Sequence, residues 1–273
     1  MIWDKRGLTN MKKLICTVMV LALMLCCLAG CGNSGKTLAD VQKAGKLTIA
    51  TSPDFPPFES LGENGQVEGI EIEILNLICQ ELGVQLEIQQ MDFESVLPGV
   101  QAGKYDVGVS GISVTPAREE NTLFTHPYCL AAQAIVVLKD SAISCKADLA
   151  GKTIAVQTAT TAEEYCMSEG YTVNAYTANA DAQQALLSGK VDAWVIDDLT
   201  AAEMVKLYNA EHGETMIVLG EAMTTEPYAF AFKLGNEELV EAINAIIDKL
   251  VADGTVAALF EKYEAPYTAP NAG

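Results

Sequence analysis

The turn around Arg118 carries the residue types of an anion-binding site. Thr115 and Pro116 predict a helix start, because a threonine hydroxyl can cap a helix and proline fits its first position. Arg118 follows in the first helical turn, where the helix dipole disfavours a cation and a capping box would have Glu or Gln. A bound carboxylate, held by the guanidinium and by N–H groups of the turn, would explain this arginine. The alternative is an ion pair with Glu119 or Glu120 on a solvated helix face.

Composition singles out the same residue. Beyond the N-terminal leader the chain has twelve lysines and a single arginine, Arg118. Lysine replaces arginine poorly where a planar carboxylate is bound by two parallel hydrogen bonds. The formal net charge of the whole chain is −19, which argues against nucleic acid as a partner. A chain of 273 residues, half of them hydrophobic, is long enough for one large domain or two lobes.

The N-terminus has the pattern of an export signal. A basic segment, Met11–Lys13, precedes the apolar segment Leu14–Leu28, which is too short to span a membrane. The sequence Leu28-Ala29-Gly30-Cys31 resembles the lipobox of bacterial lipoproteins, which are cut before the cysteine and carry diacylglycerol on its sulfur. We expect residues 1–30 to be a signal peptide with its true start near residue 11, and Cys31 to be the lipid attachment site. The alternative is an ordinary secretory signal.

The remaining cysteines and histidines do not form a metal-binding pattern. The cysteines beyond Cys31 are Cys79, Cys129, Cys145 and Cys166. None are spaced as C-x-x-C and the chain has only two histidines, which argues against a zinc site and a thioredoxin-type motif. Cys79 shares a helical face with Leu75 and Leu82 and is predicted to be buried. Export would permit disulfides, and the sequence leaves their presence open.

Strand and helix patterns alternate along the chain, which indicates parallel α/β sheets. Two segments are alike: Leu97–Ser110 and Gln184–Ile196 each have a helix, the sequence Gly-Lys-x-Asp and an apolar strand. The first strand leads into Gly111 and the second into Asp197. Because ligands of open α/β sheets bind beyond the carboxyl ends of the strands, both residues should face a cleft between two lobes. We expect strands at 46–51, 84–91, 106–110, 153–157, 191–196 and 216–219, and helices at 71–82, 93–102, 161–168, 180–187, 199–208, 236–251 and 256–263.

From about Lys46 to Tyr263 the chain resembles a bacterial family 3 solute-binding protein, one of the polar amino-acid receptors of ABC importers. The matching motifs are A-T-S-P-D-F-P-P-F, E-G-I-E-I-E-I, D-F-E-S-V-L-P-G-V-Q-A-G-K-Y-D-V, S-G-I-S-V-T-P-A-R, V-Q-T-A-T-T-A-E-E-Y and G-K-V-D-A-W-V-I-D. The resemblance implies an α/β, type II periplasmic-binding fold of two lobes. Each lobe would be a mixed sheet flanked by helices, and two crossing strands near Tyr128–Leu138 and Pro227–Phe232 would join them. The expected parts are a signal peptide at 1–30, a lipidated tether at 31–44, lobe 1 at 45–131 plus 228–268, lobe 2 at 132–227 and a tail at 269–273.

In that family an α-amino acid lies between the lobes, and the resemblance assigns roles to matching residues. Arg118 matches the arginine that grips the α-carboxylate, with Ser113 and the Thr161 backbone as further donors. Asp197 matches the carboxylate that receives the α-ammonium, although it could also cap the helix that follows it. The remaining expected ligand-binding residues are Ser110 and the Gly111 carbonyl beside the ammonium, Phe55 and Phe93 as aromatic walls, and Thr158 and Thr160 along the lobe 2 rim. Thr160 or Thr161 could also cap the next helix.

Two departures from the family pattern bear on the ligand and the site. Ser52 stands where receptors for basic amino acids, and some for glutamine, have an aspartate. With no second arginine for a distal carboxylate, the sequence predicts a neutral L-amino acid with a polar or sulfur-containing side chain. Ala159 replaces a usual glycine in the turn Q-T-A-T-T.

The resemblance implies a monomeric receptor without metal or cofactor, lipid-anchored at the outer face of the cell membrane or in a periplasm, with an ABC permease as its partner. One alternative is an extracytoplasmic enzyme similar to cyclohexadienyl dehydratase. That chemistry needs a general acid near the leaving group, whereas the cleft carboxylate, Asp197, is already assigned to the ammonium. Another is an adhesin with a vestigial cleft, against which the retained Arg118, Asp197, Phe55 and Phe93 argue.

Overall fold

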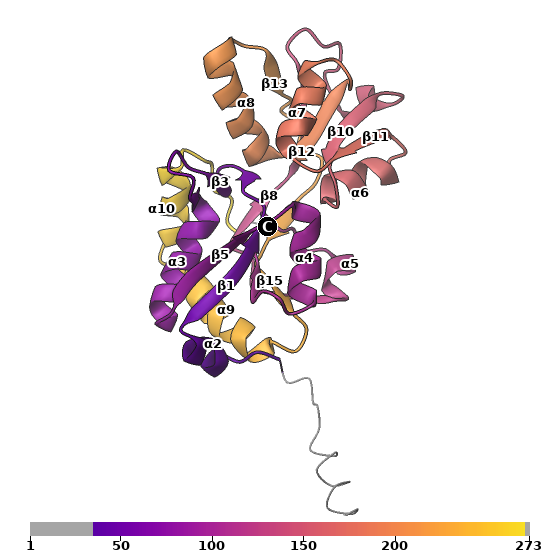
Figure 1. Cartoon of the computed structure of the whole chain (residues 1–273). Coiled ribbons are helices and arrows are strands. Elements are labelled where there is room, and N and C mark those ends of the chain that lie inside the picture. The colour runs from indigo at the N-terminus through magenta and orange to yellow at the C-terminus, as the bar shows by residue number, and fades with distance from the viewer. Residues whose placement is uncertain (1–34, 271–273) are drawn as a thin grey trace, which may run out of the picture. The chain divides into compact units, whose positions relative to one another are not determined.

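The structure is a computed structural model that describes residues 35–270 (Figure 1). The expected signal peptide, the lipid site Cys31 and the first part of the tether lie outside the described residues. Two five-stranded sheets organise residues 35–270. We call the first sheet with its helices lobe 1, and the second sheet with its helices lobe 2. Within residues 35–270 no helix is long and apolar enough to cross a membrane.

Lobe 1 contains a mixed sheet in the order β5-β1-β6-β15-β7. β1 is parallel to β5 and β6, whereas β15 is antiparallel to both of its neighbours. Helices α3, α9 and α10 pack on one face of this sheet and α4 on the other (Figure 1). The bounds are β1 Lys46–Thr51, β5 Gln85–Gln90, β6 Val107–Gly108, β7 Thr122–Phe124, β15 Ala231–Lys233, α2 Leu38–Ala44, α3 Ile70–Leu82, α4 Phe93–Gln101, α5 Pro116–Glu119, α9 Glu237–Ala252 and α10 Thr255–Lys262.

Lobe 2 repeats this arrangement in the order β11-β10-β12-β9-β13. The first three strands are parallel, and β9 runs antiparallel to both β12 and β13. Helix α6 covers one face, where Ile154 and Val195 are fully buried, and α7 and α8 cover the other. The bounds are β9 Gln133–Leu138, β10 Thr153–Gln157, β11 Thr172–Tyr176, β12 Ala193–Asp197, β13 Met216–Val218, α6 Thr161–Ser168, α7 Asn179–Leu187, α8 Asp198–His212 and a 3-10 helix at Lys146–Leu149.

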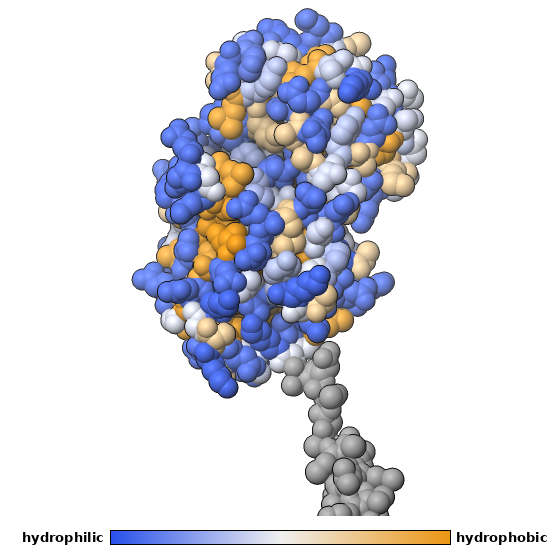
Figure 2. Space-filling view, in the orientation of Figure 1, coloured by the Kyte–Doolittle hydropathy of each residue, from blue (hydrophilic) through white to orange (hydrophobic). Residues whose placement is uncertain are grey.

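Two antiparallel strands, β8 (Cys129–Ala131) and β14 (Glu226–Tyr228), join the lobes. β8 lies within the expected crossing run Tyr128–Leu138, and β14 overlaps the start of the run Pro227–Phe232 and begins one residue before it. A small sheet of β2 (Asp54–Phe55), β3 (Glu59–Leu61) and β4 (Val67–Glu68) sits beside lobe 1. Figure 2 shows hydrophilic residues over most of the displayed face, interrupted by apolar residues above α3 and β5.

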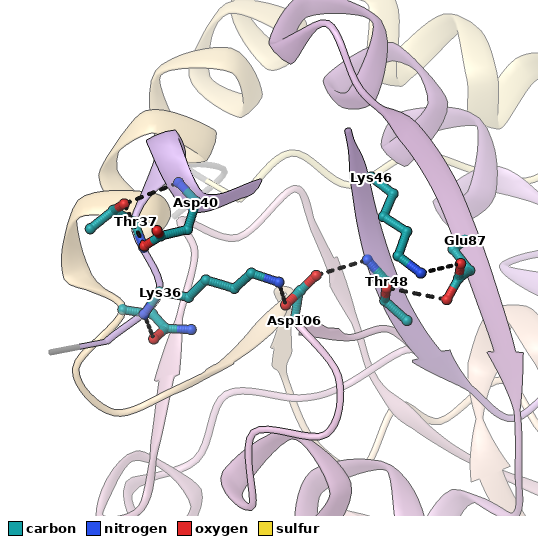
Figure 3. Close-up of polar contacts among 8 residues, drawn as sticks. Lys36, Thr37, Asp40, Lys46, Thr48, Glu87 and Asp106 are labelled. Atoms are coloured by element: carbon teal, nitrogen blue, oxygen red, sulfur yellow. Dashed lines mark hydrogen bonds and ion pairs between the residues drawn. The ribbon is translucent and has the colours of Figure 1, made fainter. Parts of the chain in front are cut away.

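The start of the described chain is fixed to lobe 1 by polar contacts (Figure 3). Lys36 Nζ lies 2.5 Å from Asp106 Oδ1, and the other oxygen of Asp106 accepts the Thr48 N–H at 2.9 Å. Thr37 and Asp40 form a capping box at the first turn of α2, in which the Asp40 carboxylate accepts the Thr37 N–H at 3.0 Å. The Lys36–Asp106 ion pair therefore connects this first segment to β1 of lobe 1.

The two-lobe fold with a mixed sheet in each lobe is confirmed, whereas the bounds of some elements differ from those expected. The strand expected at 46–51 and the helix expected at 161–168 have the predicted bounds. Both sheets are mixed, which confirms what the family resemblance implied; the alternation of strand and helix patterns by itself indicates parallel sheets. Helix α8 runs to His212, past its expected end. Helix α2 and the strands β7 and β11 were not predicted.

Candidate functional site

A pocket between the two lobes contains nine of the ten expected ligand-binding residues. About 290 Å³ in and around it, part of which is open to solvent, is not filled by protein atoms. Its lining residues are Asp54, Phe55, Phe93, Ser110, Gly111, Ser113 and Arg118 from lobe 1, and Gln157, Thr160, Thr161 and Asp197 from lobe 2. Thr158 is the exception, because its N–H and its hydroxyl both donate to the Tyr176 carbonyl, at 2.8 and 3.2 Å, which turns it toward β11. Thr158 is therefore not among the residues that line this pocket.

The carboxyl ends of two corresponding strands meet at this pocket. β6 leads into Gly111 and β12 ends at Asp197, as the similarity between the two segments predicted. Gly111 has φ of 53°, and a Cβ there would lie 2.4 Å from the Phe55 ring. Only glycine fits such a close approach without displacing the aromatic wall. The Gly111 N–H donates to Glu71 at 3.0 Å, which fixes the turn.

Arg118 is buried at the base of the pocket. Thr115 caps the short helix α5 by accepting the Arg118 N–H at 3.3 Å, as predicted. The guanidinium donates to the Ser113 carbonyl at 2.9 Å and, across the lobes, to the Ala159 carbonyl at 3.2 Å. It also lies 5.9 Å from the centre of the Phe93 ring. Because a guanidinium has five N–H donors, it retains donors for a further acceptor.

The electrostatics of Arg118 exclude the simple surface ion pair. Its side chain is only 9% exposed, and within residues 35–270 it forms no ion pair with Glu119 or Glu120. Burial lowers the pKa of Arg118, while the carboxylates of Glu164 and Glu226 oppose this shift. A buried cation without a paired carboxylate is costly, so an anion that enters the pocket would be stabilised there.

Ala159, which replaces a usual glycine of the family, has an unfavourable backbone conformation. Ala159 has φ of 64°, in the left-handed region that usually holds glycine. This conformation costs an alanine roughly 1–2 kcal/mol. Its N–H donates to the Glu163 carboxylate at 2.7 Å, which holds the turn. Thr160, the next residue, caps α6 by accepting the Glu163 N–H at 3.2 Å, one of the two caps that the sequence left open.

Asp197 is a buried carboxyl group with an altered pKa. It is 6% exposed and accepts a hydrogen bond from the Tyr228 hydroxyl. Burial, with a smaller contribution from the charge of Glu226, raises the pKa of Asp197 to about 7. Its side chain does not cap α8, which was the alternative role. The carboxylate of Asp198, the first residue of α8, accepts the Leu199 N–H at 2.9 Å and the Ala132 N–H at 3.2 Å.

Glu226, which was not predicted from the sequence, lies against two residues of the pocket lining, Ser113 and Thr161, and its charge acts on Arg118. Its carboxylate accepts the hydroxyls of Ser113 at 2.5 Å, of Thr161 at 2.7 Å and of Thr224 at 2.7 Å. Each hydroxyl has a single hydrogen, so Ser113 and Thr161 direct theirs to Glu226. Backbone N–H groups and Arg118 are then the available donors for an anion at this place.

Two buried carboxyl groups, those of Glu59 and Glu71, contact the Ser110–Gly111 turn of the pocket. Glu59 is fully buried and accepts the Ser110 hydroxyl at 2.8 Å. Burial and the neighbouring Glu71 raise the pKa of Glu59 well above its usual range. Glu71 accepts the Tyr128 hydroxyl at 2.5 Å as well as the Gly111 N–H. This pair supports the Ser110–Gly111 turn from below.

Asp54 and Gln157 also line the pocket and were not among the predicted site residues. Both lie inside motifs that carry the family resemblance, A-T-S-P-D-F-P-P-F and V-Q-T-A-T-T, which is the signal that could have found them. Within residues 35–270 no group of three or more His, Cys, Asp or Glu side chains could hold a metal ion. In the same part of the chain all four cysteines are free thiols, and Cys79 is buried as predicted.

Two α/β lobes joined by two crossing strands, with a polar pocket between them, define a type II periplasmic-binding protein. The chain belongs to the bacterial extracellular solute-binding proteins, family 3, whose family model matches residues 47–266.

Similar proteins bind different amino acids. The L-cystine-binding protein TcyJ of Escherichia coli strain K12 is 29% identical over 242 residues, covering 85% of this chain and 90% of that protein. The solved structure of an ancestral arginine-binding protein bound to arginine is 37% identical with a TM-score of 0.74, covering 80% of this chain and 98% of the other. The structure of the ancestral amino acid-binding protein AncCDT-1, described as a precursor of cyclohexadienyl dehydratase, is 33% identical with a TM-score of 0.76, covering 84% and 99%.

Proposed function

We propose that this protein is the extracytoplasmic receptor of an ABC importer, which captures an L-amino acid between its lobes and delivers it to a permease. The observation that carries the proposal is that one cation, Arg118, and one buried carboxyl group, Asp197, line the same pocket from opposite lobes. An α-amino acid is a zwitterion with matching charges. Family membership supports an amino acid as the ligand, and so do the relatives that are named for binding cystine and arginine.

In this proposal the two ends of the zwitterion have separate partners. Arg118 binds the α-carboxylate, assisted by the Thr161 N–H at the first turn of α6, where the helix dipole favours an anion. Asp197 and the Gly111 carbonyl receive the α-ammonium. Phe55 and Phe93 enclose the side chain. A ligand that contacts both lobes interacts better with the closed form than with the open one, and this difference drives closure.

The preferred side chain is a neutral one, polar or sulfur-containing. Ser52 supports this, because it replaces the aspartate of receptors for basic amino acids. Beyond the N-terminal leader the chain also has no second arginine that could bind a distal carboxylate. A second candidate is a cationic side chain such as that of arginine. It is favoured by the carboxylate of Asp54 in the pocket lining and by the arginine-binding relative.

A thermal-shift screen of the purified protein against the twenty amino acids and cystine tests the function and separates these classes. We expect a neutral amino acid or cystine to raise the melting temperature by several degrees. Tight binding of arginine or lysine without competition from any neutral amino acid would establish the second candidate. No shift with any amino acid, confirmed by calorimetry, would contradict the receptor function.

The affinity for the amino acid should depend on pH through Asp197. The ammonium binds the ionised carboxylate, whereas the pKa of Asp197 is raised to about 7 without a ligand. Affinity should therefore be full above pH 8 and fall below pH 7, by about tenfold for each pH unit, because protons then compete with the ligand. Calorimetric titrations between pH 5 and pH 8.5 measure this. An affinity that stays constant across the range would show that Asp197 is already ionised or does not bind the ligand.

We also propose that Cys31 is diacylated and holds the protein at the outer face of the cell membrane. The sequence Leu28-Ala29-Gly30-Cys31 after an apolar segment supports this. Cys31→Ser should release the protein into the medium or leave an uncleaved precursor in the membrane. Mass spectrometry of the wild-type N-terminus should find the lipid mass on Cys31, and a mature N-terminus without lipid would refute the anchor.

The enzymatic alternative rests on the resemblance to AncCDT-1 and on the raised pKa of Asp197, which suits a general acid. We propose a binding protein instead, because the same carboxyl group is needed to receive the ammonium. Turnover in a cyclohexadienyl dehydratase assay that disappears in the Asp197→Asn variant would reverse this choice.

A further inference from the structure

Helix α7 of lobe 2 has no N-cap of its own. The residue before its first turn is Ala178, which has no capping side chain, so the N–H groups of the first turn need other acceptors. The acceptor for the Asn179 N–H comes from lobe 1: Asp54 Oδ2 accepts it at 2.8 Å. A carboxylate is the preferred group at this place, because the N-terminus of a helix carries partial positive charge. An element of one lobe thus caps a helix of the other.

Asp54 is held in position from both lobes. On its own side, the Ser52 hydroxyl donates to Oδ1 at 3.0 Å. From lobe 2, the Gln157 side-chain amide donates to Oδ2 at 3.3 Å and to the Thr177 carbonyl at 3.0 Å. The carbonyl oxygen of the Gln157 side chain accepts the Asn179 side-chain amide at 3.0 Å, which closes a ring of hydrogen bonds. Burial raises the pKa of Asp54, and the hydrogen bonds from Asn179, Ser52 and Gln157 oppose the rise.

We propose that Asp54 is a positioning residue that holds the two lobes together by capping α7, and that it does so without an amino acid in the pocket. We call the contacts of Asp54 with Asn179 and Gln157 the latch. The proposal rests on the receptor function above, in which closure retains the ligand. When the lobes separate, the Asn179 N–H and the Gln157 amide lose their buried acceptor and must turn to water. The hydrogen bonds among Asp54, Gln157 and Asn179 need no group of the ligand. They therefore favour the closed form of the protein even when the pocket is empty.

The latch differs in its consequences from a carboxylate that serves only the ligand. A ligand-only role changes affinity and leaves the empty protein unaffected. A latch changes the balance between open and closed forms of the empty protein, and the ligand affinity follows from that change. Measurements on the ligand-free protein therefore distinguish the two roles, and they also remain informative if no amino acid binds.

Four variants isolate the contact. Asp54→Asn removes the anion from the cap. Asn179→Pro removes the N–H that Asp54 accepts, and proline is well suited to the first position of a helix. Asn179→Ala keeps that N–H and removes only the side chain, so it is the matched control for the proline variant. Asp40→Asn, in the capping box of α2 within lobe 1, is the matched control for an Asp-to-Asn change at a helix start (Figure 3).

The readout is the distance between spin labels on the two lobes, attached at the exposed positions Lys104→Cys and Lys190→Cys in a Cys145→Ala background, without any amino acid. Double electron–electron resonance should find a closed fraction in the otherwise wild-type protein. Asp54→Asn and Asn179→Pro should each reduce it about fivefold or more, in line with the loss of one good helix cap. Asp40→Asn should leave it unchanged, and Asn179→Ala should keep most of it.

The proposal is overturned if the empty wild-type protein is wholly open, or if Asp54→Asn has the wild-type distribution. It is also overturned if Asn179→Pro and Asn179→Ala behave alike. Far-UV circular dichroism and the melting temperature establish that each variant is folded before the distances are compared.

Discussion

Asp197→Asn is expected to weaken amino-acid binding about a hundredfold or more, the largest effect of any single substitution in the pocket. The variant keeps the size of the side chain and removes the charge that balances a buried ammonium. Breaking a buried ion pair by removing one partner costs about 3–5 kcal/mol, and about 1.4 kcal/mol corresponds to one decade in affinity. Calorimetric titration at pH 8, where the wild-type carboxyl group is ionised, measures the effect.

Asp192→Asn is the control for this experiment. Asp192 precedes the same strand, β12, and its carboxylate accepts the Thr153 N–H at 2.8 Å on the exposed surface. Its replacement should leave the affinity within about twofold of wild type, since surface contacts of this kind contribute little. Equal affinities for Asp197→Asn and the wild type would remove Asp197 from the site. The pH dependence of binding should disappear in the Asp197→Asn variant.

Arg118→Lys is expected to lower affinity at least tenfold. The lysine keeps the positive charge and loses the planar fork, and its single ammonium cannot contact the Ser113 and Ala159 carbonyls and a ligand carboxylate in the same geometry. A charge-assisted contact in a water-poor pocket contributes about 1.5–3 kcal/mol, which corresponds to at least one decade. Calorimetry measures the affinity.

The melting temperature of the empty Arg118→Lys variant separates two explanations of a loss. If it stays within a few degrees of wild type, the loss reports on the ligand carboxylate. Wild-type affinity in a folded variant would show that the guanidinium geometry is not used for binding.

The sequence predicted best those parts of the site that a short sequence pattern determines by itself. The Thr115-Pro116 helix start is confirmed, because threonine and proline have few other uses in that order. The convergence of Gly111 and Asp197 followed from the shared segment that precedes each, since equivalent strands end at the same edge of equivalent sheets. The choice between a ligand and a surface ion pair for Arg118 needed the structure, which shows the side chain buried.

The residues that were missed act through partners far along the chain. Asp54 lies in a strand of two residues, too short for any periodic signal, and its partner Asn179 is 125 positions away. Glu226 resembles a solvent-exposed acid in the sequence, whereas in the structure it is buried and accepts hydroxyls from the distant residues Ser113 and Thr161. Glu71 was expected merely to begin an amphipathic helix, and it supports the turn at Gly111 from below. Such contacts depend on tertiary packing, which no local pattern encodes.

The central claim is that the pocket binds both charges of one zwitterion. It is tested most directly by calorimetric titration with the amino acid selected by the thermal-shift screen and with its two single-charge analogues, the N-acetyl derivative and the carboxamide. The account predicts measurable binding of the zwitterion and a loss of about a hundredfold or more for each analogue, because each leaves Asp197 or Arg118 buried without its counter-charge. If either analogue binds as tightly as the free amino acid, the two-lobe clamp by Arg118 and Asp197 is wrong.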